Sequence, residues 1–328
     1  MKKIINNPDN CVSEMLLGLE IAEPSVKYLR NSEVIARRNV NKDKVALISG
    51  GGSGHEPAHA GYVGTGMLDA AVSGNVFASP SPDRIIDAIH EVGGDKGVLL
   101  IIKNYSGDIM NFGMATELAE MEGYKVLSVI VKDDVAVPDS TYSTGRRGIA
   151  GTVFVHKIAG AAAESGKSLE EVRDVAQKVI DNVRSMGMAM TPCILPGVGK
   201  AGFVLGEDEI EIGMGIHGEP GVEKTEIKTA HELAEILCNR ILNDYDYAGS
   251  EAAVLINGLG ATPLMEQYIL TAEVDAYLKT KGVKPYKYIV GNYMTSLEMA
   301  GCSVSLLKLD DELKAYLDAA ANAPAWKE

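Results

Sequence analysis

Apolar runs of strand length alternate with amphipathic segments of helix length through the first half of the chain. The apolar runs, bounded by polar turns as in buried parallel strands, lie at 44–49, 97–103 and 125–131. Helical patterns open at Ser81 and continue at 108–123, 149–165 and 168–185. This alternation predicts right-handed βαβ units in a doubly wound sheet, with ligands at the carboxyl ends of the strands.

The second half of the chain has a more mixed pattern. Strands are expected at 188–195 and 208–216, as an antiparallel pair, and at 252–256, 286–290 and 304–309. Helices are expected at 229–242, at 263–282 and from 310. A chain of 328 residues is too long for one typical core. We therefore predict two α/β domains: 1–185, a three-layer doubly wound domain with a mostly parallel sheet, and 186–328, with a mixed sheet.

Charge and cysteine content indicate which partners and which cell compartment are expected for this chain. The chain has 45 acidic and 31 basic residues, a net charge of −14, which disfavours nucleic acid and anionic membranes as partners. The four cysteines are far apart, without metal-site spacing, and are expected to be reduced. The opening residues are polar and no apolar run reaches the roughly 18 residues of a membrane span, so we expect a cytoplasmic protein.

Two histidines lie among glycines close to predicted strand ends. His55 stands in GGGSGHEP (50–57), after the first apolar run, and His217 in EIEIGMGIHGEPG (209–221). If the strand continued through this second stretch, alternation would place His217 on the face that carries Gly213 and Gly215. Missing side chains on that face would leave room for a small molecule.

Three stretches imitate well-known sites. His55 to His59 matches the zinc pattern H-E-x-x-H, but Pro57 predicts that a helix begins there, which would separate the two histidines, and no third ligand is evident. The run 213–218 matches G-x-G-x-x-G, but the following Glu-Pro-Gly interrupts the required helix. The glycines at 50–54 lack the Lys-Ser/Thr of a P-loop. The sequence thus predicts neither a metal site nor a nucleotide cradle.

The remaining candidates are polar residues and glycines at strand ends: Gly51, Gly52, Ser53, His55, Lys103, Asp108 and His217. Each alone has an ordinary explanation. A loop histidine is often a structural hydrogen-bonding group, Lys103 would end a strand, and Asp108 would be the N-cap of the next helix. Together they favour a binding or catalytic site.

Three long motifs, GGGSGHEP, KNYSGDIMNF (103–112) and GIHGEPG (215–221), carry a family resemblance. With MKKIIN at the start, GRRG at 145–148, NGLGATPL at 257–264 and SLLKLDDE at 305–312, the chain is similar over nearly its whole length to the substrate-binding K subunits of phosphotransferase-system-dependent dihydroxyacetone kinases.

The resemblance implies a homodimer of two-domain α/β subunits in which His217 binds the ketone carbon of dihydroxyacetone as a hemiaminal. It assigns His55 to hydrogen bonding of the substrate and assistance of hemiaminal formation, and Asp108 to general-base catalysis. Gly52 and Lys103 would position the reacting hydroxyl, and the substrate would also lie against Gly51, Ser53 and Gly218.

The same resemblance implies that the phosphoryl group comes from ADP held with magnesium on a separate L subunit, which a phosphocarrier M subunit recharges. This chain would then bind no cofactor itself. Asp133 and Asp134 are the nearest candidates for a magnesium site, and we interpret them instead as a solvated strand end.

A binding protein of the same fold is the alternative. A non-catalytic paralogue would also capture dihydroxyacetone on His217 and act as a transcriptional coactivator, but it would not need a base such as Asp108. One departure from the family pattern, SPSPDR at 79–84 in place of TSPTPDK, is expected to affect only a surface or a partner contact.

Overall fold

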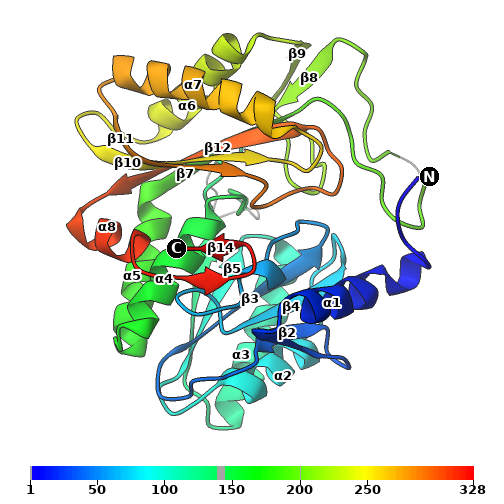
Figure 1. Ribbon diagram of the computed structural model, residues 1–328, viewed down its shortest axis with the longest axis vertical. Helices are drawn as coiled ribbons and strands as arrows, with labels where there is room; N and C mark the ends of the chain where they lie inside the picture. The colour runs from blue at the N-terminus through cyan, green and yellow to red at the C-terminus, as the bar shows by residue number, and fades with distance from the viewer. Residues whose placement is uncertain (1, 139–144, 200) are drawn as a thin grey trace. The chain divides into compact units, whose positions relative to one another are not determined.

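The computed structural model describes residues 2–138, 145–199 and 201–328 and divides the chain into two compact units (Figure 1). Unit 1 consists of Met1–Val131, Val153–Ile180 and Leu313–Glu328, and unit 2 of Lys132–Thr152 and Asp181–Glu312. Each unit contains one six-stranded sheet, and unit 1 also has a short two-stranded one, β13 (Asn322–Ala323) with β14 (Trp326–Lys327).

The sheet of unit 1 is mostly parallel, as predicted. Its strands, in spatial order, are β1 (Val26–Leu29), β2 (Val34–Arg37), β4 (Ala70–Val76), β3 (Ala46–Ser53), β5 (Val98–Lys103) and β6 (Val126–Val131). The strands β4, β3, β5 and β6 run parallel, whereas β2 pairs antiparallel with both β1 and β4. The carboxyl ends of β3 and β5, where ligands are expected, therefore lie at one edge of the sheet.

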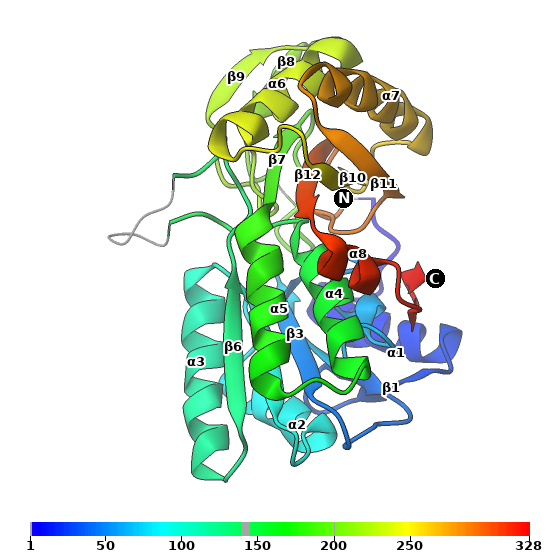
Figure 2. The same ribbon diagram turned by 90° about the vertical axis from the view of Figure 1, so that its left-hand side faces the viewer.

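Helices cover both faces of this sheet. The unit contains η1 (Pro8–Asn10), α1 (Cys11–Ala22), η2 (Ala60–Tyr62), α2 (Pro82–Val92), α3 (Ser106–Met121), α4 (Thr152–Glu164) and α5 (Leu169–Asn182). Side chains of α2 and α3 pack against Val98, Leu100 and Ile102 of β5, while the alternating residues Leu99 and Ile101 are equally buried on the other face. Figure 2 shows α3 and α5 on either side of β6.

The sheet of unit 2 is mixed, as predicted. Its strands, in spatial order, are β11 (Lys284–Gly291), β10 (Glu251–Gly258), β12 (Gly301–Leu309), β7 (Val183–Ala189), β8 (Glu209–Ile212) and β9 (Glu223–Glu226). Of these pairs, β10 and β11 run parallel and the others antiparallel. The predicted antiparallel pair corresponds to β7 and β8, but β7 shares only Met188 and Ala189 with the strand predicted at 188–195.

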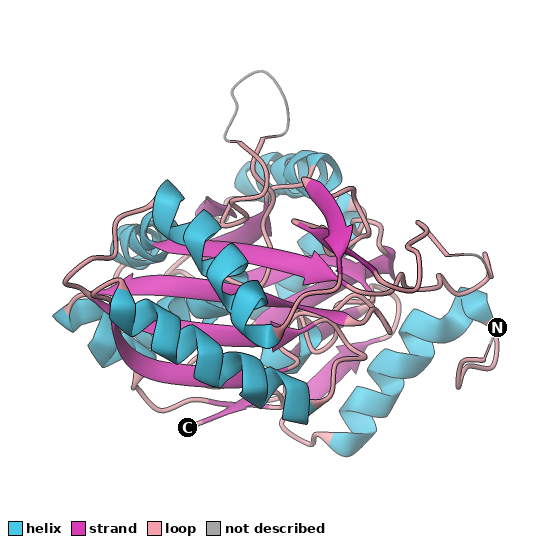
Figure 3. Cartoon of the chain, turned by 90° about the horizontal axis from the view of Figure 1, so that it is seen from above, coloured by secondary structure: helices cyan, strands magenta, loops and turns pink. Residues whose placement is uncertain are grey.

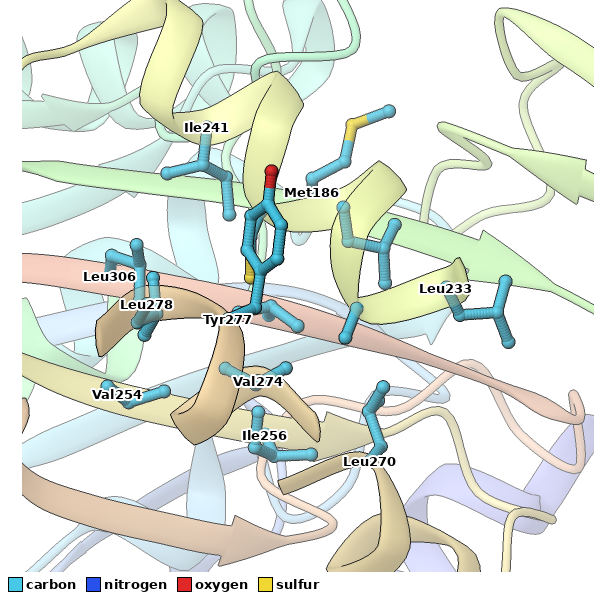
Figure 4. Close-up of a cluster of buried hydrophobic side chains, with 14 of the residues drawn as sticks. Met186, Leu233, Ile241, Val254, Ile256, Leu270, Val274, Tyr277, Leu278 and Leu306 are labelled. Atoms are coloured by element: carbon cyan, nitrogen blue, oxygen red, sulfur yellow. The ribbon is translucent and has the colours of Figure 1, made fainter. Parts of the chain in front are cut away.

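Two helices, α6 (Ala230–Asp244) and α7 (Leu264–Thr280), lie against this sheet (Figure 3). Thr229 caps α6 through a reciprocal hydrogen-bond pair with Glu232. Figure 4 shows the core that results: Leu233 and Ile241 of α6 and Val274 of α7 face strand residues such as Ile256 and Leu306. This core anchors β7, from which the chain passes through β8 toward His217.

The units are not contiguous in sequence, which differs from the predicted division into 1–185 and 186–328. After β6 the chain enters unit 2, where Asp133 accepts hydrogen bonds from the backbone N–H groups of Ile149 and Gly151. The last helix, α8 (Asp311–Leu317), leads back into unit 1, where Lys157 donates a hydrogen bond to the carbonyl of Tyr316. The exchanges combine these polar contacts with buried apolar residues such as Leu313 and Leu317 of α8, and the periodicity of a single element does not reveal which unit it joins.

Two local predictions are wrong. No α-helix begins at Pro57, because residues 56–59 form turns that lead into η2. The strand expected at 208–216 ends at Ile212, because Gly213 adopts a φ of 80° and turns the chain. The alternation argument for His217 therefore does not apply. Among the described residues, no helix combines the length and the apolar composition that crossing a membrane requires.

Candidate active site

Gly50, Gly51 and Gly52 of the first motif lie inside β3, and only Gly54 follows the strand. A Cβ atom on Gly50 would lie 2.4 Å from the carbonyl oxygen of Val72, and one on Gly52 would lie 2.6 Å from the backbone nitrogen of Ala78. On Gly51 it would lie 2.6 Å from Lys103 Nζ. The glycine run is needed because other groups approach the strand this closely.

Lys103 and Asp108 form a buried ion pair beside Gly51. Lys103 is the last residue of β5 and Asp108 lies in the first turn of α3, and the distance from Lys103 Nζ to Asp108 Oδ2 is 3.3 Å. Neither side chain is more than 5% exposed. The N-cap of α3 is Tyr105, so Asp108 is not the cap. The pair thus places a carboxylate beside an ammonium group at the start of a helix, next to the glycines of β3.

Replacing Gly51 by alanine is expected to lower catalytic turnover by about 10²-fold, because the new methyl group would displace Lys103 and Asp108. The φ of 153° at Gly51 adds backbone strain. Gly113→Ala in α3 is the matched control, because a Cβ there meets nothing within 4 Å. Steady-state kinetics on both variants check the prediction, and equal turnover for Gly51→Ala and Gly113→Ala would contradict it.

His55 and Ser53 lie near the same strand end but have different surroundings. The His55 ring is fully buried and stacks on Phe77, with the ring centroids 5.1 Å apart. Ser53 donates a hydrogen bond to the carbonyl of Gly74, 2.7 Å away. The backbone of Phe77 also lies close to Gly52 of β3. Phe77 therefore lies beside both the His55 ring and the glycines of β3. Unit 1 therefore collects all the predicted residues of the first two motifs.

The segment 79–84, which departs from the family pattern, packs against the start of α3. Asn111 of that helix donates a hydrogen bond to the carbonyl of Pro80, and Ser79 lies beside Gly107. The expectation that this segment affects only a surface or partner contact is thus incomplete, because it also supports the turn that carries Asp108.

His59 and His156 form a buried pair of histidines in unit 1. His59 Nδ1 and His156 Nε2 are 2.9 Å apart, and the outer nitrogens of both rings have no hydrogen-bond partner among the described residues. Burial, together with the charge of Lys103, lowers the pKa of both, that of His156 to about 3. His59 thus contacts His156, while His55 stacks on Phe77.

Acidification is expected to destabilise the protein through this pair. Both rings are neutral in the folded protein, whereas in the unfolded chain they take up protons below about pH 6.5. Each ring therefore lowers the free energy of unfolding by roughly 1 kcal/mol for every unit by which the pH is decreased below that value. His156→Gln should therefore show a shallower loss of unfolding free energy between about pH 7 and about pH 5, measured by urea titration. The exposed His231, whose pKa Glu273 raises, is the control with the opposite sign: His231→Gln should lose slightly more stability on acidification. Parallel curves for wild type and His156→Gln would contradict the prediction.

His217 lies in unit 2, on the loop that follows β8. The backbone N–H of Gly213 donates to the carbonyl of Gly187, and Gly218, with a φ of 77°, turns the chain directly after the histidine. The His217 side chain is 18% exposed. It is therefore neither sealed in the core nor fully solvated, as a group that reacts with a small ligand must be.

Glu219 holds the imidazole of His217 in place. One carboxylate oxygen, Oε1, lies 3.0 Å from His217 Nδ1, and the other, Oε2, accepts the backbone N–H of the same residue at 2.9 Å. Burial opposes the charge on Glu219, but the hydrogen bond from His217 and the nearby guanidinium of Arg147 lower its pKa to about 2. An ionised carboxylate only accepts hydrogen bonds, so Nδ1 carries a proton.

Gly215 makes room for this carboxylate. A Cβ atom on Gly215 would lie 2.0 Å from Glu219 Oε2 and 2.6 Å from Arg147 Nη1. Arg147 donates hydrogen bonds to Asp134 and to the carbonyl of Gly213, which ties the loop to the interior of unit 2. Gly215 is thus required because neighbouring protein groups occupy the space beside it. This corrects our interpretation that Gly215 cleared space for a substrate.

Asp133 and Asp134 are not a solvated strand end, which corrects that interpretation. Both are buried, Asp133 against backbone N–H groups and Ser185, and Asp134 against Arg147. Burial raises the pKa of both carboxyls, that of Asp134 to about 6. Across the described residues no group of three or more metal-binding side chains is gathered. These two carboxylates are engaged in holding the chain.

The sequence-based prediction missed Glu219, Arg147 and the pair of His59 with His156. A signal for Glu219 was present, because a histidine followed two residues later by a glutamate across a glycine turn permits this contact. The signal for Arg147 was only the charge within GRRG, and nothing connected His59 with a residue almost one hundred positions away.

Residues 17–325 match the Dak1 domain, and the chain belongs to the Dak1 family. It is 54% identical over 314 residues to the PTS-dependent dihydroxyacetone kinase 1, dihydroxyacetone-binding subunit DhaK, of Listeria innocua, with 95% of each chain covered. It is 51% identical to the corresponding subunit of Lactococcus lactis, covering 95% of this chain and 94% of that one. With the PEP-dependent subunit of Escherichia coli the identity is 42%, and 99% of each chain is covered.

Solved structures agree with this assignment and confirm the predicted α/β fold. The dihydroxyacetone kinase of C. freundii superimposes with a TM-score of 0.93 at 38% identity, covering 99% of this chain and 60% of that one. The dihydroxyacetone kinase operon co-activator Dha-DhaQ superimposes with a TM-score of 0.92, also at 38% identity, covering 96% of this chain and 98% of that one. The fold alone therefore does not separate a kinase subunit from a coactivator.

Proposed function

We propose that this chain is the dihydroxyacetone-binding subunit of a phosphoenolpyruvate-dependent dihydroxyacetone kinase, which produces dihydroxyacetone phosphate. The observation that carries the proposal is the buried pair of Lys103 and Asp108 at the glycine-rich end of β3 and β5. A protein that only binds a neutral triose has no need of a buried, charged carboxylate, whereas phosphoryl transfer from a hydroxyl group needs a base.

His217 is the proposed nucleophile that tethers the substrate. Its Nε2 forms a bond to the ketone carbon, the π electrons of the carbonyl move to oxygen, and that oxygen takes up a proton with the help of His55. The product is a hemiaminal. Glycerol has no carbonyl group and forgoes this bond, so the tether selects dihydroxyacetone although the hydroxyl groups of the two molecules are alike.

Asp108 is the proposed general base for the transfer. As a terminal hydroxyl of dihydroxyacetone attacks phosphorus, its proton passes to the carboxylate. Lys103 holds that carboxylate in place, and with Gly52 it positions the hydroxyl group. Gly51, Ser53 and Gly218 present backbone and a small side chain to the rest of the three-carbon substrate.

The phosphoryl donor belongs to a partner in this proposal. ADP and magnesium would be held on an L-type subunit that an M-type phosphocarrier recharges from phosphoenolpyruvate, so this chain supplies the acceptor and the base. We further infer a cytoplasmic homodimer, in line with the family resemblance and the negative charge. Sedimentation of the purified chain tests the dimer.

The similarity to the co-activator Dha-DhaQ supports one alternative, a dihydroxyacetone-binding coactivator without catalytic activity. Reconstitution separates the two functions. The purified chain is mixed with L and M subunits of a related kinase, phosphoenolpyruvate and dihydroxyacetone, and dihydroxyacetone phosphate is measured with a coupled dehydrogenase. Product that depends on this chain supports the kinase. As a control, the L and M subunits must be active with their own K subunit. If this chain then binds dihydroxyacetone but no product forms, the coactivator function is supported.

A further inference from the structure

The carboxylate of Glu219 satisfies two donors of one residue at once. It accepts the backbone N–H of His217 through Oε2 and faces ring Nδ1 through Oε1, so both the loop and the ring are fixed by one side chain. The backbone of Gly215 adds a hydrogen bond to the carbonyl of Glu219, 3.2 Å away, which closes the loop around the histidine. The imidazole therefore has a defined orientation as well as a defined position.

This arrangement decides which ring nitrogen is the nucleophile. A neutral imidazole has one protonated nitrogen and one with a lone pair, and the hydrogen bond made by the first selects the tautomer. Because an ionised carboxylate accepts from Nδ1, the lone pair is on Nε2. The other tautomer would place a proton on Nε2 and remove its nucleophilicity.

We propose that Glu219 is a positioning residue that fixes His217 as the tautomer protonated at Nδ1 and balances the positive charge that the ring gains during addition. This inference rests on the proposed role of His217 as the nucleophile. When Nε2 bonds to the carbonyl carbon, its lone pair becomes the new bond, the carbonyl electrons move to oxygen, and the ring becomes an imidazolium. The alkoxide then takes up one proton from solvent with the help of His55, and the imidazolium gives up its Nδ1 proton to solvent through Glu219, so one proton is gained, one is lost and the hemiaminal is neutral.

A glutamine cannot replace this carboxylate. Both oxygens of Glu219 face donors, so the amide of a glutamine would place its NH₂ group against either the backbone N–H or Nδ1 of His217. In the first case two donors oppose one another, and in the second the ring is driven to the tautomer protonated at Nε2. The negative charge that balances an imidazolium is lost in both cases.

Nitrogen NMR of the ligand-free protein tests the tautomer directly. The protein is labelled with ¹⁵N in its histidine rings, the signal of residue 217 is assigned with His217→Gln, and spectra are recorded at about pH 8, where an ordinary imidazole is neutral. The wild type is expected to show a protonated Nδ1 and an unprotonated Nε2. Glu219→Gln is expected to shift the ring toward protonated Nε2.

Glu211→Gln is the matched control. Glu211 holds the same loop by accepting the backbone N–H of Gly221 at 2.7 Å, and this bond survives with an amide oxygen. The control should therefore keep the wild-type tautomer. In parallel, the affinity for dihydroxyacetone should fall by about 10- to 100-fold in Glu219→Gln, as is usual when the partner that orients a reactive histidine is lost, and should stay nearly unchanged in Glu211→Gln.

The outcomes distinguish this inference from the function on which it rests. An Nε2-protonated ring in the wild type, or the same tautomer in wild type and Glu219→Gln, overturns the role of Glu219 even if dihydroxyacetone still binds covalently to His217. Failure of the wild type to form an adduct overturns the proposed function instead, and it does so in a separate measurement, because the NMR arm contains no ligand.

Discussion

Asp108→Asn is expected to bind dihydroxyacetone normally but to transfer the phosphoryl group roughly 10²- to 10⁴-fold more slowly than the wild type, because general-base catalysis is lost. The amide has nearly the same shape as the carboxylate beside Lys103. It accepts no proton from the attacking hydroxyl. The three-component assay measures turnover, and calorimetric titration of this chain alone measures binding, so the chemical step and substrate capture are followed separately.

The control for this variant is Asp174→Asn. Asp174 also lies on a helix, α5, but its side chain is exposed and outside the candidate site. Its replacement should leave turnover within a few-fold of wild type. Equal turnover by Asp108→Asn and wild type would remove Asp108 from the mechanism and leave the proposed phosphoryl transfer without its base.

His217→Gln is expected to abolish the covalent adduct and to lower turnover by roughly 10³-fold or more, because the substrate is no longer held in a reactive geometry. Glutamine can form hydrogen bonds but is not a nucleophile toward a ketone. The variant should also lose most of the preference for dihydroxyacetone over glycerol, which competition binding measures.

The exposed His231 provides the control for this substitution. Its imidazole faces Glu273 on the surface of unit 2, so His231→Gln should retain both adduct formation and turnover. If His217→Gln kept the full preference for dihydroxyacetone over glycerol, selection would rest on the hydroxyl groups alone and the tether would be unnecessary.

The fold followed from the sequence where apolar periodicity determines structure. The buried parallel strands β3, β5 and β6 and the long helices α6 and α7 lie close to their predicted positions. Strands β1, β2 and β4 were missed because they are short or rich in alanine and glycine, and carry little pattern. The exchange of segments between the units was missed because the pattern of a single helix or strand does not reveal which unit it joins.

The site was predicted only in part. The sequence identified His55, Lys103, Asp108 and His217 as polar residues at the ends of elements, and the pairing of Lys103 with Asp108 is what the meeting of parallel strand ends allows. The sequence did not reveal why glycine is required at positions 51 and 215. Gly51 and Gly215 are required because charged side chains lie where their Cβ atoms would be, and this close approach is visible only in three dimensions.

The most direct test of the central claim is the detection of a bond between dihydroxyacetone and His217. Protein with ¹⁵N-labelled histidine rings is mixed with dihydroxyacetone labelled with ¹³C at the carbonyl carbon. The ketone signal is expected to be replaced by that of a tetrahedral carbon with one-bond coupling to Nε2 of residue 217, and to remain in His217→Gln. A bound ligand whose carbon stays a ketone in the wild type, or couples to another histidine, would contradict the claim.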